Sequence, residues 1–348
     1  MKKLKALLFF HLFVLNIYAQ IGGEGTYNFL NNTSSAKVAA MGGKLISKVD
    51  DDLSLTYHNP SLLNSNMDRH LSLNFVNYYA GSNFGYASFA HSITNQDNTA
   101  IGLQYINYGS FIAADALGNI TGSFTAGEYA LNLVFSHKLD SSFTLGGDIR
   151  GIMSILENYK SYGISTDWGI TYNNKKDLFT LALVLRNLGS QIKAYTPGTF
   201  EKLLFEIQLG VTKKLRYAPF SFSMTVQNLE KPNMALPDSL TNNNVESGLS
   251  SAKKGGIEKI SDQVMRHLIF GVEFTPLSSF AIRCGYNYQR RQEMKNIANP
   301  GFVGFSWGLG LTIANFQLNY SRERFHTFGA ANIFSISTDL SGRKRKKS

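Results

Sequence analysis

The feature that most constrains this chain is a strict alternation of large apolar residues with small or polar ones. Residues 205–212 (FEIQLGVT) place Phe, Ile, Leu and Val at odd positions and Glu, Gln, Gly and Thr at even positions. Residues 220–227 (FSFSMTVQ) repeat the pattern. Successive side chains of a β-strand point to opposite faces, so each stretch predicts a strand with one apolar face and one polar face. The sequence therefore favours an all-β fold.

Segments with this alternation follow one another through most of the chain. Each is about ten residues long, which is the length that a tilted strand needs to cross a bilayer. We count an even total of fourteen, and even totals are typical of single-chain bacterial barrels. The segments are 70–78, 83–91, 99–107, 124–137, 142–155, 159–172, 178–187, 203–214, 218–229, 266–275, 279–288, 301–312, 315–325 and 329–338.

The lengths of the connectors support a membrane barrel. If both ends of the barrel are periplasmic, each even-numbered segment should lead into a short turn, and all of them do. Long connectors follow odd-numbered segments only, at 108–123, 188–202, 230–265 and 289–300. We therefore predict a transmembrane antiparallel up-and-down β-barrel of about fourteen strands with an N-terminal plug segment.

A soluble β-sandwich is the alternative fold, because its strands also alternate. Here the polar face is poor in Lys and Glu and rich in Gly, Ser, Thr and Asn, and charged residues make up 17% of the chain, against about 25% in soluble domains. The mean hydropathy of −0.12 argues against helical membrane spans. Most of the net charge of +10 lies at the two ends of the chain, so the body is nearly neutral and we expect no nucleic-acid partner.

The chain divides into a leader, a lumen segment, a barrel and a tail. Lys2, Lys3 and Lys5 precede an apolar stretch that is too short to span a bilayer as a helix, and Ala19 offers a cleavage site. No Cys follows, so we expect no lipoprotein anchor. The predicted parts are a signal peptide (1–19), an N-terminal plug or lumen segment (20–69), the barrel (70–340, with a long extracellular loop at 231–262) and a basic periplasmic tail (341–348). The tail is expected to be solvated, with a docking contact for a periplasmic partner as the alternative.

No motif in the sequence predicts catalysis. Asp50, Asp51 and Asp52 are adjacent but lack the spacing of a calcium loop, and Gly42–Gly43 lacks the other residues of a phosphate loop. The seven histidines are scattered, there is no Gly-x-Ser-x-Gly elbow, and Cys284 has no possible partner for an internal disulfide. We therefore expect no catalytic site, no cofactor and no metal.

Several charged residues fall on the polar face of predicted strands. Facing lipid, they would be costly, so they are expected to point into the lumen and to form structural ion pairs there, with one another or with the plug segment. A transport path is the alternative role. These residues are Asp148, Arg150, Asp167, Arg186, Glu206, Glu273 and Arg283.

Two groups of motifs resemble known families. Spaced Gly, Asp and Asn-Pro elements near the start of the chain resemble the fatty-acid-transporter-like (FadL-like) barrels, which have fourteen strands and an N-terminal plug. These elements are Gly25–Leu30, Ala39–Gly43, Asp50–Asp52 and Tyr57–Leu63. Together with the opening, a second group resembles the PorV/PorQ group of these barrels, which belongs to the type IX secretion system. It comprises Phe205–Val211, Lys213–Leu215 and Ala218–Phe220.

The second resemblance implies a non-catalytic barrel in the outer membrane of a Gram-negative bacterium. Such a barrel would anchor a PorZ-like surface partner in the complex that attaches cargo to lipopolysaccharide, beside a PorU-like sortase and a PorV-like barrel. The first resemblance alone implies a FadL-like transporter of hydrophobic small molecules, which is the alternative function. An outer-membrane enzyme would need a clustered nucleophile or acid/base set, which the sequence does not suggest.

Overall fold

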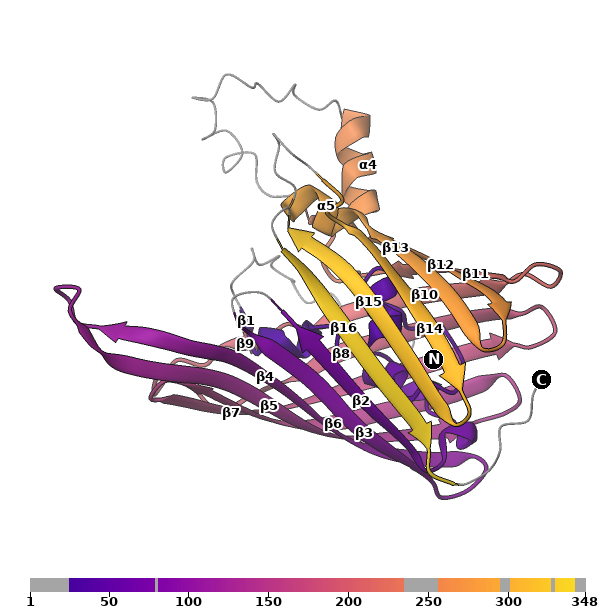
Figure 1. Ribbon diagram of the computed structural model, residues 1–348, viewed down its shortest axis with the longest axis horizontal. Coiled ribbons are helices and arrows are strands. Elements are labelled where there is room, and N and C mark those ends of the chain that lie inside the picture. The colour runs from indigo at the N-terminus through magenta and orange to yellow at the C-terminus, as the bar shows by residue number, and fades with distance from the viewer. Residues whose placement is uncertain (1–24, 79–80, 235–255, 295–300, 327–328, 342–348) are drawn as a thin grey trace, which may run out of the picture.

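Fourteen antiparallel strands form a closed barrel (Figure 1). The computed structural model describes residues 25–78, 81–234, 256–294, 301–326 and 329–341. Most barrel strands pair with their neighbours along the chain, β8 pairs with β10, and the last strand pairs with the first. Two further short strands, β1 (Gly25–Thr26) and β9 (Lys202–Leu203), pair in parallel beside β8. The predicted fourteen-stranded up-and-down barrel is confirmed.

Each of the fourteen predicted segments overlaps one barrel strand. The strands are β2 (His70–Asn77), β3 (Asn83–Ser92), β4 (Asp97–Ala114), β5 (Ile120–Lys138), β6 (Phe143–Leu156), β7 (Tyr159–Asn174), β8 (Phe179–Lys193), β10 (Glu206–Lys214), β11 (Phe220–Val226), β12 (Leu268–Leu277), β13 (Phe280–Asn287), β14 (Phe305–Ile313), β15 (Phe316–His326) and β16 (Gly329–Asp339).

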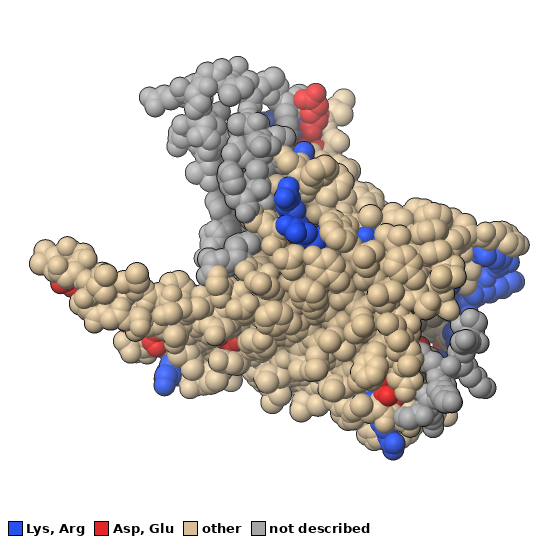
Figure 2. Space-filling model, viewed as in Figure 1, with Lys and Arg blue, Asp and Glu red and all other residues tan. Residues whose placement is uncertain are grey.

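The alternation in sequence becomes an apolar outer surface and a polar inner one. On β5, Leu131 and Leu133 are 50% and 58% exposed, whereas the intervening Asn132 is 1% exposed. Figure 2 shows that the middle of the wall in this view is almost free of charged side chains. Such a continuous apolar band is unfavourable in water and suits the hydrocarbon core of a bilayer.

Two of the four predicted long connectors are shorter than expected. The prediction of a connector over 108–123 is wrong, because β4 and β5 pair from Ser110–Thr125 out to Ala114–Ile120. This hairpin projects past its neighbours, since β3 stops pairing with β4 at Asn107 and β6 stops pairing with β5 at Ala126. The connector at 188–202 is likewise shortened, because β8 continues to Lys193.

The other two long connectors each contain a helix. Helix α4 (Gly256–Arg266) occupies the end of the 230–265 connector, and α5 (Tyr288–Met294) occupies the start of the 289–300 connector. The two helices lie against each other at the end of the barrel opposite the short turns (Figure 1). The predicted long extracellular loop at 231–262 therefore includes the first part of α4, and its placement outside the cell stays a prediction. Residues 235–255 lie outside the described part of the chain.

Residues 25–69, which we call the lumen segment, run through the inside of the barrel (Figure 1). Most of its side chains are buried. That this segment acts as a plug stays a prediction. After β1 its short elements are η1 (Asn28–Asn31), α2 (Ala36–Ala40), η2 (Leu53–Tyr57), η3 (Pro60–Leu62) and η4 (Ser65–Met67).

Side-chain caps explain why this polar segment folds into short helices. Four residues stand immediately before the last four elements, and each accepts a hydrogen bond from a backbone N–H at the start of its helix. These caps are Ser35, Asp52, Asn59 and Asn64. Ser, Asp and Asn are the preferred residues at this position, because they satisfy N–H groups that have no partner within the helix.

None of the described helices is both long enough and apolar enough to cross a membrane. The predicted signal peptide lies outside the described residues, as does the predicted basic tail after Ser341.

The apolar band leads to a testable contrast between two exposed residues. Leu133→Arg, in the middle of the band, is expected to cost about 2–4 kcal/mol of unfolding free energy, because the cation would sit in hydrocarbon. Ile112 is 72% exposed on the projecting hairpin, and Ile112→Arg should change stability by only about 0.5 kcal/mol. Urea unfolding in lipid vesicles measures both. Equal costs would contradict the placement of the bilayer.

Candidate functional site

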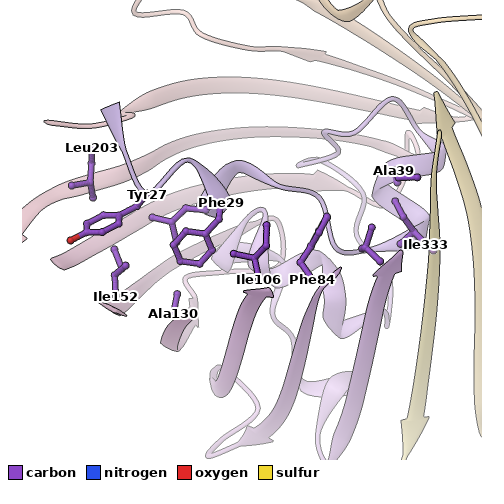
Figure 3. Packing of buried hydrophobic residues seen from close by; sticks show 13 residues of the cluster. Tyr27, Phe29, Ala39, Phe84, Ile106, Ala130, Ile152, Leu203 and Ile333 are labelled. Carbon is purple, nitrogen blue, oxygen red and sulfur yellow. The ribbon is translucent and has the colours of Figure 1, made fainter. Parts of the chain in front are cut away.

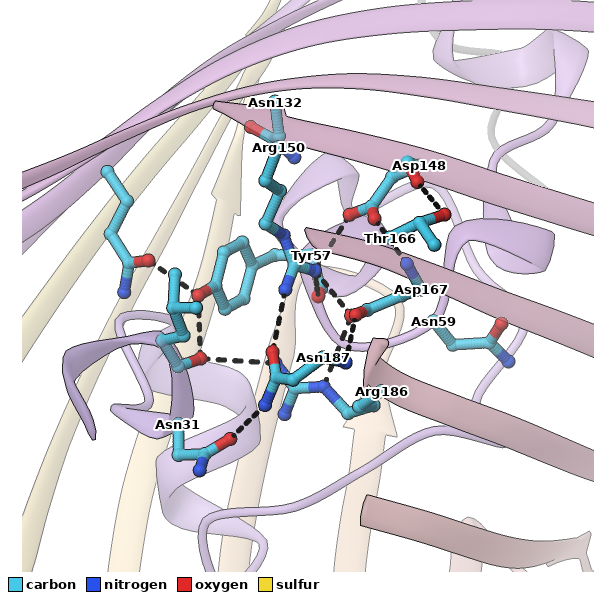
Figure 4. A network of polar contacts seen from close by, with 12 residues as sticks. Asn31, Tyr57, Asn59, Asn132, Asp148, Arg150, Thr166, Asp167, Arg186 and Asn187 are labelled. Atoms are coloured by element: carbon cyan, nitrogen blue, oxygen red, sulfur yellow. Dashed lines mark hydrogen bonds and ion pairs between the residues drawn. The ribbon is translucent and has the colours of Figure 1, made fainter. Parts of the chain in front are cut away.

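A buried charged network joins three strands at the centre of the lumen (Figure 4). Arg150 on β6 pairs with Asp148 at 2.7 Å and with Asp167 on the neighbouring strand β7. The three side chains are completely buried. Asp148 and Asp167 stand opposite each other in the β6–β7 ladder, so the arginine between them offsets the repulsion of two adjacent carboxylates.

A β-bulge brings a second arginine into the network. The β7–β8 register shifts between Thr166 and Trp168, and Asn187 adopts a left-handed backbone with φ of 57°. Asn tolerates this conformation better than most residues. As a result, the Asn187 N–H donates to Asp167 Oδ1 at 2.7 Å, and Arg186 Nε donates to Asp167 Oδ2 at 3.3 Å.

The lumen segment contacts this network through Tyr57. The guanidinium carbons of Arg150 and Arg186 lie 4.8 Å and 5.6 Å from the centre of the Tyr57 ring. The Tyr57 hydroxyl lies 2.7 Å from the Leu30 carbonyl oxygen and 2.5 Å from Gln104 Oε1. Two cations beside one aromatic ring, together with the hydrogen bond of its hydroxyl to the wall strand β4, fix the lumen segment against three strands of the barrel.

Lysines of the lumen segment supply further pairs. Lys44 pairs with Glu206 on β10. Lys48 Nζ lies 2.6 Å from Glu273 Oε1 on β12, and the same carboxylate accepts from Arg283 Nε on β13 at 2.8 Å. Both glutamates are buried and cannot be solvated by bulk water. Removing either lysine would therefore leave a buried carboxylate with fewer partners.

The three adjacent aspartates have local roles. Lys37 lies 2.6 Å from Asp50 and 3.2 Å from Asp52. Asp51 accepts a hydrogen bond from the Asn66 amide at 3.1 Å. In the described part of the chain no group of three or more His, Cys, Asp or Glu side chains is arranged to hold a metal ion.

The structure places all seven predicted lumen charges at buried positions, none more than 6% exposed. It brings six of them into two groups, Asp148–Arg150–Asp167–Arg186 and Glu273–Arg283, while Glu206 pairs with the lumen segment instead. Sequence reasoning allowed for pairs with the lumen segment but did not identify Lys44 and Lys48 as the partners. One signal was present, since the seven residues comprise four acids and three arginines and so need a further cation.

A second ion pair that the sequence analysis missed lies at the outer end of the lumen. Arg290 on α5 pairs with the buried Glu323 on β15. Gly43 passes beside this pair with φ of +93°, and a Cβ there would lie 2.8 Å from Arg290 Nη2 and 2.9 Å from Glu323 Oε1. Gly43 is therefore required for close approach of the backbone rather than for phosphate binding.

Helices α4 and α5 are joined by polar contacts. The Tyr288 hydroxyl lies 2.8 Å from Asp262 Oδ1, and Arg266 Nε donates to Asp262 Oδ2 at 2.9 Å. Burial and the neighbouring Asp262 raise the pKa of Tyr288 to about 12, so the hydroxyl stays protonated and donates to the carboxylate.

An apolar cluster lies in the outer half of the lumen (Figure 3). Tyr27 and Phe29 of the lumen segment pack with Phe84, Ile106 and Ile152 of the wall. Tyr78, Tyr108 and Tyr195 border this cluster. The lumen thus has an apolar outer layer above a charged middle layer, and the lumen segment contributes to both.

Several solved structures resemble this fold. The toluene transporter TbuX of Ralstonia pickettii is 11% identical, with 90% of this chain and 100% of that chain covered and a TM-score of 0.53. The toluene transporter TodX of Pseudomonas putida is 13% identical, with coverages of 88% and 96% and a TM-score of 0.52. A TodX mutant described as a monoaromatic hydrocarbon channel reaches a TM-score of 0.55 at 15% identity, with coverages of 89% and 99%.

These similarities show the fold alone. They show that the chain shares its barrel fold with these proteins, which are named as channels or transporters. No family model matches the sequence, and no curated protein matches it significantly. Nothing in the comparisons supports the expected membership of the PorV/PorQ group or a link to type IX secretion.

The central network predicts a large cost for removing its arginine. Arg150→Met leaves Asp148 without its arginine and Asp167 with only Arg186, so the unfolding free energy should fall by about 3–5 kcal/mol. Urea unfolding followed by tryptophan fluorescence measures this change.

Two further variants control that experiment. Arg216→Met removes an exposed arginine from a turn and should change stability by about 0.5 kcal/mol or less. Adding Asp148→Asn to Arg150→Met should restore part of the loss, because one uncompensated carboxylate is then removed. A simple sum of the single costs would show that the two residues are not coupled.

Proposed function

We propose that this chain lies in the outer membrane of a Gram-negative bacterium and carries hydrophobic small molecules across it. The apolar cluster in the outer half of the lumen is the observation that carries the proposal. It offers a cargo from outside an apolar environment formed by aromatic and aliphatic side chains, as small-molecule sites usually do. The FadL-like architecture shared with hydrocarbon transporters supports the same reading.

Transport requires the lumen segment to move. Tyr27 and Phe29 are part of the apolar cluster and are 3% and 1% exposed, so a cargo must displace them. Below these two residues a cargo would meet the charged layer, and an apolar molecule cannot form hydrogen bonds or ion pairs with its side chains. A path past this layer therefore needs the lumen segment to shift away from the wall, breaking pairs such as Lys44–Glu206.

A reversible tether tests this requirement. The hydroxyls of Ser47 and Thr212 lie 2.7 Å apart, and joining them as a Ser47→Cys/Thr212→Cys disulfide in a Cys284→Ser background fixes the lumen segment to β10. Oxidised protein in vesicles should pass little labelled toluene or fatty acid, and reduction should restore the flux.

The matched control joins two wall strands that are already paired. Ser72 and Ser337 are buried register partners on β2 and β16, and their disulfide leaves the lumen segment free. Its flux should not depend on reduction. If the reduced, well-folded protein passes no hydrophobic solute in either background, the transport proposal is wrong.

A second candidate function is a non-catalytic scaffold in a surface attachment complex. The projecting β4–β5 hairpin favours it, because outside Asn107 and Ala126 neither of its edges pairs with another strand of the described residues. Open strand edges are sites for pairing with another chain. The proposed partners are those implied by the sequence resemblance, namely a PorZ-like surface protein, a PorU-like sortase, a PorV-like barrel and lipopolysaccharide.

A pull-down from detergent-solubilised outer membrane distinguishes the two functions. The full chain and a variant with residues 108–125 replaced by a short turn are compared. Recovery of secretion components by the full chain only would support the scaffold, whereas recovery of no protein by either variant would contradict it. Among the described residues, β3 pairs with β4 only as far as Asn107 and β6 pairs with β5 only as far as Ala126, so the trimmed barrel keeps its wall pairing and should still fold.

A further inference from the structure

A groove of about 420 Å³ crosses the outer, lipid-facing wall. Its volume lies within the range of about 300–1,000 Å³ that is usual for small-molecule sites. Phe135, Leu145, Trp168 and Leu183 form its sides and are each 40–56% exposed on the outside of the barrel. The other lining residues are His137, Gly146, Gly147, Gly169, Ile170 and Leu185.

Glycines make the floor of this groove. Gly147 faces outward in a row where its neighbours are Phe135 and Trp168, and its missing side chain lets the Trp168 ring lie over it, because a Cβ there would be 3.1 Å from Trp168 Cζ3. Gly146 and Gly169 face inward against the lumen segment, where a Cβ would lie 2.2 Å from Ser61 N and from Asn59 Oδ1 respectively. The lumen segment therefore supports the wall from inside at this point and prevents its inward movement.

The groove has a defined position relative to the membrane. It begins near the Phe143–Tyr172 ring pair, whose centroids are 4.9 Å apart next to the short turns. Aromatic pairs of this kind mark the interface of a barrel with the bilayer, and short turns mark its periplasmic side. The groove therefore runs from the periplasmic interface into the hydrocarbon layer, where apolar chains are the available occupants.

Polar groups lie at the interfacial end. His137 lines the groove and its Nδ1 lies 2.7 Å from Asp97 Oδ1, with both side chains partly exposed. Lys138 follows His137 and is also exposed. A carboxylate beside an imidazole and an ammonium group complements a zwitterionic headgroup, which carries an amine and a phosphate.

We propose that this groove binds one acyl chain of a zwitterionic phospholipid from the periplasmic leaflet, with its headgroup beside Asp97, His137 and Lys138. The acyl chain would cover the exposed part of Trp168, which is 56% exposed in the described structure. Apolar contact with the walls and charge contact at the interface together make this lipid preferred over its neighbours in the bilayer.

The two tryptophans of the chain allow a direct test. Trp168 lies in the groove, and Trp307 on β14 faces lipid with a similar exposure of 46% but away from it. Trp307→Phe and Trp168→Phe give two single-tryptophan proteins for reconstitution with increasing fractions of phosphatidylethanolamine brominated on its acyl chains. Trp168 should be half-quenched at an about fourfold lower fraction than Trp307, the factor that one additional buried methylene contributes.

Substitution of the floor is the second arm. Gly147→Leu fills the groove and should bring the quenching of Trp168 onto the curve of Trp307. Gly151→Leu is the matched control, because Gly151 also faces outward on β6, lies outside the groove and has open space around it. It should leave the preference unchanged. Retained heat-modifiable gel mobility shows that each variant is folded.

Three results would overturn the proposal. Identical quenching curves for the two tryptophans would show that no lipid is preferred at the groove, and this comparison needs no floor variant. An unchanged preference in folded Gly147→Leu would place the lipid elsewhere. Preferential quenching by a brominated free fatty acid but not by the brominated phospholipid would assign the groove to a different ligand. None of these outcomes bears on transport through the lumen.

Discussion

Backbone hydrogen bonding in hydrocarbon is the constraint on which this structure depends. Lipid offers no partner for an N–H or C=O group, so a sheet that enters a bilayer must close on itself. Closure of β7 on β8 and of β16 on β2 satisfies this constraint. It also determines what the lumen must contain, because a barrel of fourteen strands is wider than its own side chains can fill.

The lumen segment fills this interior and also supplies charged partners for the inner wall. The inner wall carries acids in excess of its arginines, and the lysines of the lumen segment approach Glu206 and Glu273. Buried pairs of this kind do not add much net stability, but each becomes costly when one partner is lost. They therefore specify where the lumen segment lies more than how stable the barrel is, and a cargo or a partner could use that specificity.

Much of the barrel could be predicted because the period of a strand is fixed. A residue such as Leu133 must face lipid if Asn132 faces the lumen, so the strands and the inward charges follow from the sequence alone. The β4–β5 hairpin could not be located in this way, since beyond the membrane both of its faces are exposed and the alternation loses its meaning. The partners of Lys44 and Lys48 depend on the path of an irregular segment, which has no period to read. The roles of Gly43 and Gly147 depend on atoms that only the three-dimensional packing brings close.

The order of residues along the chain has a consequence for assembly. The lumen segment is synthesised before any barrel strand, yet the Ala36 N–H donates to Ser335 Oγ of the last strand, 299 residues later. Its remaining contacts are spread over strands that appear one after another. Contacts between such distant residues form slowly. The polar groups of the lumen segment therefore have no native partners until the barrel strands have formed around it. A factor that shields these groups during this interval would speed folding more than one that acts on the strands.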